Sequence, residues 1–540
     1  MNITFTYVIV GGGSAGCVLA NKLSENPENT VLLIEAGPED KNPMIRIPKG
    51  FAKVVGQKKF TYSFAANPGG TGKDSEETWI RGRTLGGSSS INGLQYQRGN
   101  PADYEHWEND LGLQGWGWKT MGPIFKNMED HELGETDFRG IGGPVHITQT
   151  KNKTMLMDKL IMAAGQLGVP SKADPNEPDQ FGISYICANI HKGERWSSAK
   201  AFLQPARHRT NLTVVTLTEV ARLLFEGTRV KGVRCHCNGV EVDYFCTQEV
   251  ILSAGAMMSP KILQLSGIGD REHLSRLGIS VVAHSPEVGE NMREHLIFTT
   301  QFRLTGDYSQ NKEYQGWRML KNAFRYMLTQ SGLLAGSAYD VTAFIKSLPG
   351  STCPDAQLVC SPITMDLEKW EGFHKGIPLE KKPGCSMLGY AMKPESKGFL
   401  KISSADPQAD MEIVHNHLSH EHDRQVAVAI VRYIRNLFSQ SAIAPYIKEE
   451  LLPGKHIQTD EEILLAYNTL GGPGYHTAGT CRMGVDASSV VDSQLRVNGV
   501  QGLRVVDLSV FPTLVSGNTH GPVMAVAWRG AQLILDKGIG

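Results

Sequence analysis

The sequence lacks any long apolar run. None of its segments approaches the roughly 18 consecutive apolar residues that a membrane-spanning helix needs. The apolar stretch at residues 8–10 is too short, and too soon followed by glycine, to be the core of a signal peptide. We therefore expect no membrane span and a cytoplasmic location.

A charge excess and a cysteine framework are also missing. The formal net charge is −1 and no long basic run is present, which argues against a nucleic-acid partner. The nine cysteines are an odd number without the spacing of a disulfide scaffold, which fits a reducing compartment. Cys235 and Cys237 flank a histidine in a strand-like segment, but no second thiol pair matches them, so we expect no metal site.

The composition is that of an ordinary globular protein. Hydrophobic residues make up 41% and charged residues 20% of the 540 residues, which is ample for a large core. The length exceeds that of a usual single domain, so we expect more than one structural unit.

A strand, a glycine-rich turn and a helix are predicted at the N-terminus. An apolar strand at residues 7–10 runs into Gly11, Gly13 and Gly16, spaced G-x-G-x-x-G, and an apolar helical pattern follows at once. Gly11 permits the tight turn, Gly13 lets the backbone approach a pyrophosphate, and Gly16 lets the helix pack closely on the strand. The free N–H groups of such a helix point at the phosphates of a dinucleotide.

A second strand at residues 30–34 ends on Glu35, about twenty residues past the glycines. A carboxylate at this place accepts hydrogen bonds from an adenosine ribose and repels a 2′-phosphate, which argues against NADP. The alternative is a glycine turn that binds no ligand. Strand, turn, helix and acid together favour a dinucleotide site.

Two later segments are rich in glycine and small polar residues. Residues 82–92 form either a nest of backbone N–H groups or a flexible surface loop, and composition alone leaves both open. Residues 255–269 follow a strand-like segment at 249–253. There Ser259 can cap a helix that begins at Pro260, and Gly267 can close it.

These segments together resemble the glucose-methanol-choline (GMC) flavoprotein oxidoreductases. The resemblance rests on six stretches in the family's order after the N-terminal glycines, at residues 82–92, 255–269, 288–291, 475–484, 503–507 and 517–522. It implies an α/β fold (α+β overall) in which an FAD-binding doubly wound Rossmann-like domain is interleaved with a substrate domain of antiparallel sheet backed by helices. The expected ranges are 1–150, 190–300 and 460–540 for the FAD-binding domain, and 151–189 and 301–459 for the substrate domain.

The resemblance also implies which residues bind FAD. They are Gly11, Gly13, Ser14, Ala15, Gly16, Glu35, Ala36, Arg83, Leu85, Gly86, Gly87, Ser88, Asn92, Gly93, Leu94, Val220, Ala254, Gly255, Asp507, Leu508, His520, Gly521 and Pro522. Some family members carry a histidine just before the position of Asn92 that bonds covalently to the flavin. Because this chain has Ile91 there, we expect non-covalent FAD.

The activity implied by the resemblance is FAD-dependent oxidation of a primary or secondary alcohol to an aldehyde or ketone, by hydride transfer to flavin N5. The hydroxyl proton must leave at the same time, so a base is needed, and imidazole titrates near neutrality. In the resembling family the histidine that opens His-x-x-Gly-Thr stands over the reactive face of the flavin, which makes His476 the expected general base. Asn518 is the expected partner that orients the substrate oxygen, and His520 is the alternative. If residues 517–520 form a strand, the side chains of Asn518 and His520 point to the same side of it.

Two other functions stay open at this point. One is a GMC-like lyase that contains FAD without net redox chemistry, and the other is a structural protein that binds FAD. Gly474 lies two residues before the expected base and indicates either extra room beside the flavin or a turn requirement. Trp317, Tyr339, Phe344 and Trp370 are candidates for an apolar lining. The alcohol, the electron acceptor (oxygen or another) and the oligomeric state cannot be predicted.

Overall fold

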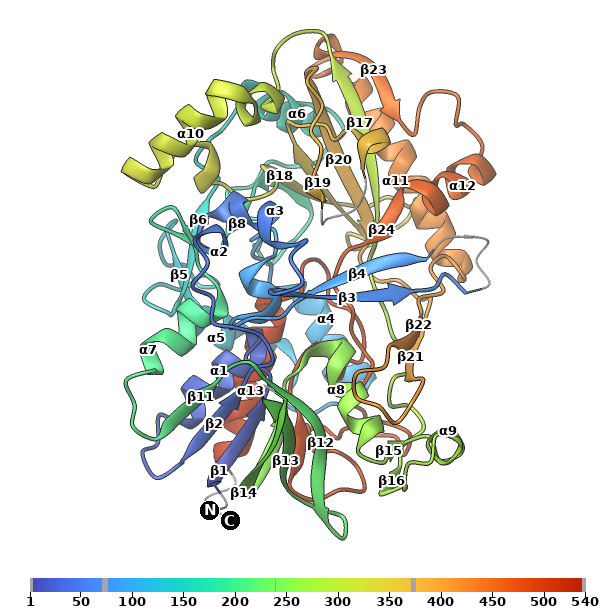
Figure 1. Cartoon of the computed structure of the whole chain (residues 1–540). Coiled ribbons are helices and arrows are strands. Elements are labelled where there is room, and N and C mark those ends of the chain that lie inside the picture. The colour runs from blue at the N-terminus through green and yellow to red at the C-terminus, as the bar shows by residue number, and fades with distance from the viewer. Residues whose placement is uncertain (1–2, 70–75, 238, 371–374, 537–540) are drawn as a thin grey trace.

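The computed structural model describes residues 3–69, 76–237, 239–370 and 375–536. Two large sheets occupy the lower and upper halves of the molecule in Figure 1, and helices pack against each of them. The expected combination of a dinucleotide-binding sheet with a second, antiparallel sheet is therefore present.

The lower sheet has the strand order β11-β2-β1-β14-β13-β12, and β25 also pairs with β14. β1 pairs in parallel with β2 and β14, as does β2 with β11. Helices α1 and α13 pack against each other beside this sheet, and α8 packs against β12. The elements are β1 (Ile3–Val10), β2 (Val31–Ile34), β11 (Leu212–Val215), β12 (Thr218–Glu226), β13 (Arg229–Cys237), β14 (Val240–Leu252), β25 (Leu503–Val505), α1 (Ser14–Leu23), α8 (Gly255–Leu265) and α13 (His520–Leu535).

The upper sheet has the order β23-β17-β20-β19-β18-β7, and β24 pairs with β17. Its strand pairs are antiparallel. Its elements and those packed near it are β7 (Gly182–Tyr185), β17 (Leu296–Leu304), β18 (Val341–Ile345), β19 (Ala356–Ser361), β20 (Gly384–Ala391), β23 (Ile447–Leu452), β24 (Gly471–Pro473), α6 (Met155–Gln166), α10 (Gly316–Thr329), α11 (Glu421–Ser439) and α12 (Asp460–Leu470).

Burial explains why these segments form a sheet with helices behind it. Every residue of β18 and β19 is buried, as expected for central strands that are covered on both faces. α11 buries Val426, Ile430 and Ile434, which are spaced by four residues and form one apolar stripe against β20.

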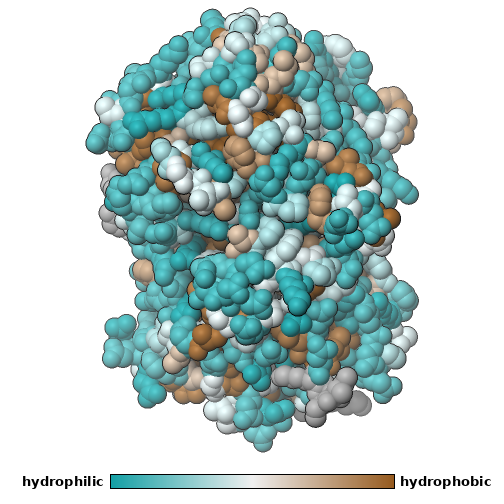
Figure 2. Space-filling view, turned by 180° about the vertical axis from the view of Figure 1, so that it is seen from behind, coloured by the Kyte–Doolittle hydropathy of each residue, from teal (hydrophilic) through white to brown (hydrophobic). Residues whose placement is uncertain are grey.

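The remaining helices and strands lie around the two large sheets. They are β3 (Thr61–Ala66), β4 (Glu77–Gly82), β5 (Glu129–His131), β6 (Val145–Gln149), β8 (Cys187–Ala188), β9 (Ile190–His191), β10 (Glu194–Arg195), β15 (Ile268–Gly269), β16 (Ala283–His284), β21 (Phe399–Ile402), β22 (Met411–Val414), α2 (Pro43–Arg46), α3 (Phe51–Val54), α4 (Pro101–Glu105), α5 (Trp118–Met128), α7 (Gln204–Ala206) and α9 (Arg271–Arg276). On the face in Figure 2, hydrophobic residues lie in separate patches among hydrophilic ones. Within the described ranges, no helix has both the length and the apolar character needed to cross a bilayer.

Two sequence expectations need correction or refinement here. α8 begins at Gly255 rather than at Pro260, and Ser259 lies inside the helix, where its hydroxyl bonds to a carboxylate instead of capping. Gly267 does end the helix, with φ +84°. The domain ranges stay a prediction. β24 belongs to the range 460–540 that was expected in the FAD-binding domain, but it pairs with β17 of the upper sheet. Residues 1–2, 70–75, 238, 371–374 and 537–540 of these ranges lie outside the described residues.

Candidate active site

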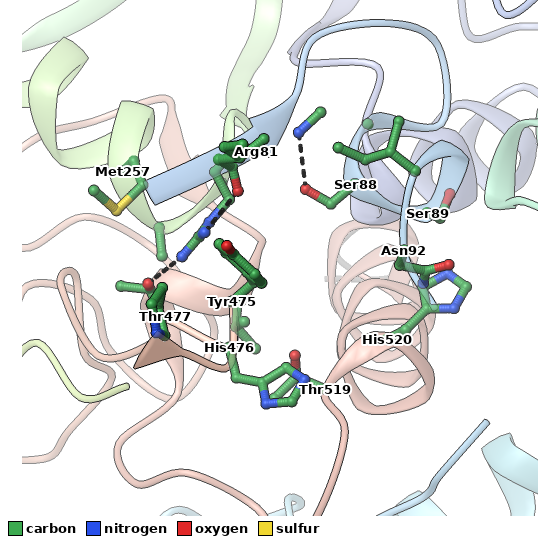
Figure 3. A pocket seen from close by; sticks show the side chains of 18 of the residues that line it. Arg81, Ser88, Ser89, Asn92, Met257, Tyr475, His476, Thr477, Thr519 and His520 are labelled. Carbon is green, nitrogen blue, oxygen red and sulfur yellow. Dashed lines mark hydrogen bonds between the residues drawn. The ribbon is translucent and has the colours of Figure 1, made fainter. Parts of the chain in front are cut away.

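A cavity of about 610 Å³ lies between the two halves of the molecule. This volume is in the usual range for a ligand pocket. Most of the expected site residues line it: Gly11, Gly13, Ser14, Ala15, Glu35, Ala36, Gly87, Ser88, Asn92, Gly93, Leu94, Val220, Ala254, Gly255, His476, Asp507, Leu508, Asn518 and His520. Figure 3 shows several of these side chains around the cavity.

The N-terminus of α1 forms one end of the cavity. The chain turns after β1 at Gly11, whose φ is +105°. Only glycine fits there, because a side chain would meet the carbonyl oxygen of Ser253 at 2.4 Å. Gly13 at the N-cap offers no capping side chain, and Ser14 and Ala15 line the cavity. The first N–H groups of this helix therefore suit a phosphate.

The glycine-rich run after β4 packs on this turn. Gly86 (φ +83°) donates its backbone N–H to the carbonyl of Gly12 at 2.7 Å. A side chain on Gly87 would lie 2.8 Å from the Cα atom of Gly13, and Ser89 and Ser90 are buried. The run is thus a packed part of the cavity wall, and the flexible surface loop is ruled out.

Two buried carboxyl groups face this end. Glu35 accepts hydrogen bonds from the N–H groups of Gly12 (2.9 Å) and Gly37 (2.7 Å), and burial raises its pKa to about 7. Asp507 follows β25 and accepts from the N–H of Gly255 at 2.9 Å and the hydroxyl of Ser259, and burial raises its pKa too. Each oxygen of Glu35 accepts one hydrogen bond and keeps a further acceptor site for a ligand hydroxyl. The two oxygens of Asp507 each accept two, since the second oxygen accepts from the N–H and the hydroxyl of Ser509. Glycines, helix N–H groups and carboxylates together fit a dinucleotide such as FAD.

Six expected FAD-binding residues do not line the cavity: Gly16, Arg83, Leu85, Gly86, Gly521 and Pro522. Close packing against a backbone carbonyl explains why residues 16 and 521 are glycines. A side chain on Gly16 would lie 1.9 Å from the carbonyl oxygen of Gly11, and one on Gly521 would lie 2.2 Å from that of Gln97. Gly16 thus has the packing role that the motif predicts.

His476 lies at the other end of the cavity, where the upper sheet contributes. It follows Tyr475, whose positive φ of +63° is an uncommon conformation for a side-chain-bearing residue. His295, which directly precedes β17, lies with its Nδ1 atom 2.9 Å from Nδ1 of His476. Its Nε2 atom is 2.7 Å from the carbonyl oxygen of Met392.

These contacts assign the tautomer of both rings. A carbonyl oxygen only accepts, so His295 carries its proton on Nε2 and has a lone pair on Nδ1. That lone pair accepts the Nδ1–H of His476. His476 therefore presents an unprotonated Nε2 atom to the cavity.

Asn518 completes the chain of hydrogen bonds. Its amide nitrogen is 3.2 Å from Nε2 of His476, and its carbonyl oxygen accepts from Gln357 at 3.3 Å. Gln357 in turn accepts the hydroxyl hydrogen of Tyr390. The amide of Asn518 is thus oriented with its donor toward His476.

Electrostatics keep both histidines neutral. Burial, and then the neighbouring His295 and Arg81, hold the pKa of His476 well below its ordinary value. Burial lowers the pKa of His295 to about 4. The carboxylate of Glu294 pairs with the guanidinium of Arg81 at 3.2 Å and accepts the backbone N–H of His476 at 2.6 Å. At neutral pH the cavity therefore holds an unprotonated imidazole beside an amide donor.

Comparison with known proteins shows the family of this chain. A family model described as GMC oxidoreductase matches residues 5–297, and a second one with the same description matches residues 394–527. This chain belongs to the GMC oxidoreductase family. The resemblance seen in the sequence is confirmed, and so is the fold class.

Individual relatives agree along almost the whole length. Human choline dehydrogenase, mitochondrial, is 38% identical over 541 residues, covering 98% of this chain and 89% of the human protein. The alcohol dehydrogenase (acceptor) of Pseudomonas putida is 34% identical over 537 residues, covering 99% and 96%. A formate oxidase of Aspergillus oryzae RIB40, solved to follow the effect of a mutation on FAD modification, superposes with a TM-score of 0.91 at 25% identity, covering 99% of both chains. The chain is thus an oxidoreductase acting on CH–OH donors, and FAD is the indicated cofactor.

His520 of this GMC oxidoreductase lies away from His476 (Figure 3). His520 is the first residue of α13, and residues 517–519 do not form a strand. The condition under which Asn518 and His520 would face the same side is therefore not met. Its Nε2 atom is 3.0 Å from the hydroxyl of Ser198, and its Nδ1 atom is 3.2 Å from the amide oxygen of Asn189. The structure brings Asn518, not His520, to the ring of His476.

The reason for Gly474 differs from both readings of the sequence. A methyl group there would lie 3.0 Å from the Cβ and carbonyl oxygen of His295 and 3.1 Å from Nδ1 of His476. The glycine therefore permits the close approach of two histidines and does not leave extra room.

We expect Gly474→Ala to displace the two rings by a few tenths of an ångström. Because catalysis is sensitive to such misplacement, kcat/KM should fall about tenfold, while the free energy of unfolding falls by about 1 to 3 kcal/mol. Gly472→Ala is the matched control, since nothing lies within 4 Å of the added methyl group. Steady-state kinetics and urea unfolding of both variants measure this, and equal kcat/KM values would contradict it.

The predicted aromatic lining is only partly present. Tyr339 and Trp370 line the cavity. Trp317 is 67% exposed on α10, and Phe344 is buried in a cluster with Tyr390 and Met392. Other apolar residues from the upper half also line the cavity, and they are Ile297, Val359, Met365, Leu367, Ile377 and Leu388.

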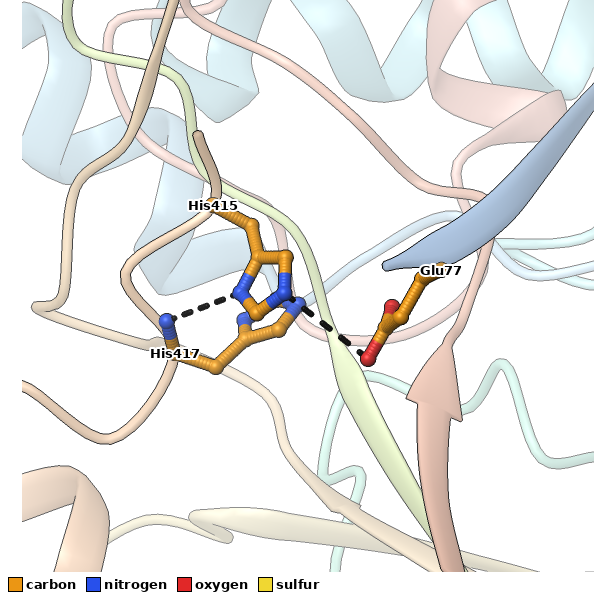
Figure 4. Close-up of side chains that lie close together, drawn as sticks. All are labelled: Glu77, His415 and His417. Atoms are coloured by element: carbon orange, nitrogen blue, oxygen red, sulfur yellow. Dashed lines mark hydrogen bonds and ion pairs between the residues drawn. The ribbon is translucent and has the colours of Figure 1, made fainter. Parts of the chain in front are cut away.

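Two buried clusters of this GMC oxidoreductase contain residue types that bind metal ions, namely Glu77 with His415 and His417, and His131 with Asp174 and Cys187. The hydrogen bonds of His415 and His131, however, are those of neutral histidines. In Figure 4, the backbone N–H of His417 donates to Nδ1 of His415 at 3.2 Å, so neutral His415 carries its proton on Nε2, facing Glu77 at 3.8 Å. His131 accepts from Leu133 in the same way and faces Asp174. A protonated Nε2 has no lone pair for a metal ion.

Proposed function

We propose that this protein oxidises a primary or secondary alcohol to an aldehyde or ketone, with His476 as general base and Asn518 as the group that orients the alcohol oxygen. One observation carries this proposal: Nε2 of His476 is unprotonated and faces an amide donor in the cavity that also contains the dinucleotide-type end. His476 and Asn518 come from the stretches 475–484 and 517–522, which are among the family motifs.

FAD, bound non-covalently between α1, the glycine-rich run and Asp507, would supply the hydride acceptor. The chain's own residues handle the proton. An alcohol hydroxyl placed between His476 and Asn518 donates its hydrogen to Nε2 of His476 and accepts from the amide of Asn518. As the proton arrives, Nδ1 of His295 accepts the Nδ1–H of the imidazolium and stabilises it.

The lining of the His476 end favours an uncharged alcohol with an apolar body. Of the described residues that line the cavity, the acidic ones are Glu35, Glu219 and Asp507, and these lie on the lower sheet or next to it, away from His476. Among the described lining residues, a quaternary ammonium group near His476 would have aromatic rings such as Tyr339, Trp370, Tyr390 and Tyr475 as partners, but no carboxylate. We therefore propose apolar alcohols as better substrates than choline.

An anaerobic screen tests this proposal. We expect apolar primary and secondary alcohols to bleach the visible absorbance of the bound flavin, and choline to do so at least about tenfold more slowly. Bleaching also excludes a lyase without net redox chemistry and a protein that only binds FAD. If no alcohol bleaches the flavin, the proposed oxidation is wrong. Admitting air, or adding a dye acceptor, then distinguishes oxygen from another electron acceptor.

Non-covalent attachment follows from Ile91, whose hydrocarbon side chain lines the cavity and offers no nucleophile. We expect acid precipitation to release all of the flavin into the supernatant. A yellow pellet after washing would contradict this. A cytoplasmic location also stays part of the proposal, supported by nine cysteines that are all free thiols.

A further inference from the structure

Helix α10 presents an apolar face to solvent. Five of its large apolar side chains are exposed by 60% or more, and they are Trp317 (67%), Leu320 (72%), Phe324 (60%), Met327 (71%) and Leu328 (68%). The other large apolar side chains in the described part of the chain with more than 60% exposure are Val240 on β14, Leu465 on α12 and Val485 in a loop, and each stands singly. Scattered exposed residues are ordinary, whereas five on one helix mark an interaction surface.

The five side chains lie on one side of the helix. At 3.6 residues per turn they fall within an arc of about 100°. The opposite side is fixed to the protein, because the hydroxyl of Tyr326 donates to Gly193 at 3.0 Å and the amide of Asn322 donates to Glu313 at 3.1 Å. Figure 1 shows α10 at the outer edge of the upper half, and its apolar side chains are exposed to solvent.

The charges of α10 select the kind of partner. The helix contains Arg318, Lys321 and Arg325 and no acidic residue. Arg318 and Lys321 each lie about 6.0 Å from the ring of Trp317, so cations border the apolar arc at its tryptophan. A second copy of the chain would bring the same cations to the contact, where like charges would repel one another. An apolar face with Trp, Phe and Leu beside basic residues is the composition of a helix that lies in the surface of an anionic bilayer.

We propose that α10 docks this protein on a bilayer containing anionic lipids, with its apolar face among the headgroups and upper acyl chains. The docked helix lies next to the cavity wall. The turn after it, at Leu333–Ala335, packs on Pro48–Gly50, which leads into α3, and Phe51 of α3 lines the cavity. Lys49 also donates a hydrogen bond to the hydroxyl of Tyr314, just before α10, at 2.6 Å. The docking does not depend on the proposed reaction.

Vesicle flotation with the full-length, FAD-loaded protein tests the docking. We expect binding to vesicles of phosphatidylcholine with phosphatidylglycerol, weaker binding to phosphatidylcholine alone, and weakening by sodium chloride. The double variant Leu320→Glu, Phe324→Glu should bind at least about tenfold more weakly. Lys321→Glu, Arg325→Glu should lose most of the preference for anionic vesicles. The controls Leu465→Glu and Val485→Glu alter equally exposed apolar residues elsewhere and should bind as the wild type does.

Two further readouts place the contact. Brominated lipids should quench tryptophan fluorescence of the wild type, and Trp317→Phe should lose most of that quenching. All α10 variants should keep wild-type thermal unfolding and dye-coupled alcohol oxidation without vesicles, because their side chains face solvent. The proposal is overturned if the wild type does not bind vesicles or if the α10 variants bind as the controls do. It is also overturned if sedimentation shows a wild-type dimer that Leu320→Glu, Phe324→Glu converts to monomers, since the face would then join two copies.

Discussion

Replacing His476 by alanine should lower kcat/KM for the best alcohol by about two to four orders of magnitude. The reason is that the imidazole Nε2 is the unprotonated nitrogen placed beside the orienting amide of Asn518. Without it, the alcohol proton has no acceptor of suitable pKa. FAD should remain bound, because the glycines of the N-terminal motif, Glu35 and Asp507 lie at the other end of the cavity.

Anaerobic single-turnover reduction measures this effect separately from binding and product release. His208→Ala is the control, since His208 is an exposed histidine that does not line the cavity. Loss of visible flavin absorbance in purified His476→Ala would show a folding or binding defect, so the flavin content is measured first. A flavin-loaded variant that is reduced at the wild-type rate would contradict the assignment of the base.

Replacing His295 by leucine should lower kcat/KM about 100-fold, although His295 does not line the cavity. Its Nδ1 atom accepts the Nδ1–H of His476 and thereby fixes the proton on the side of the ring that faces away from the substrate. Without this acceptor the proton can occupy Nε2 instead, and that tautomer cannot act as a base. Loss of the correct tautomer is known to reduce catalysis by up to about 10⁴ in a catalytic triad.

His295→Gln distinguishes positioning from packing. A glutamine side chain offers a carbonyl oxygen to His476 and an amide donor to the carbonyl of Met392, so it should recover at least about tenfold of the loss. The effect should lie in kcat rather than in KM. If leucine and glutamine variants are equally slow while both unfold like the wild type, His295 acts through packing and the tautomer argument is wrong.

The sequence predicts one end of this site well and the other incompletely. Gly11, Gly13 and Gly16 have the spacing of a dinucleotide-binding turn, so the motif suffices to place them, although the carbonyl oxygen that a side chain on Gly11 would meet belongs to distant Ser253. His295 and Gln357 escaped prediction because their role depends on which strands of the upper sheet lie beside the C-terminal segments. The only signal for His295 was its place shortly after the family stretch at 288–291.

Two expectations failed for related physical reasons. Pro260 was expected to begin a helix, but α8 starts five residues earlier, at Gly255, whose backbone N–H donates to the carboxylate of Asp507. Gly474 was expected to leave room or make a turn, yet its missing side chain is needed for the approach of His295 to His476. Both depend on residues more than 175 positions away, which no local pattern encodes.

The pH dependence of kcat/KM, compared between the wild type and His476→Ala, tests the central claim most directly. His476 must be neutral to accept a proton, and its pKa is held below the ordinary value of 6.5 by burial and by its neighbours. We therefore expect wild-type kcat/KM to be constant above pH 6.5 and to fall on acidification below it, with uptake of one proton. His476→Ala should lack this acidic limb. An acidic limb that persists unchanged in His476→Ala would show that another group is the base.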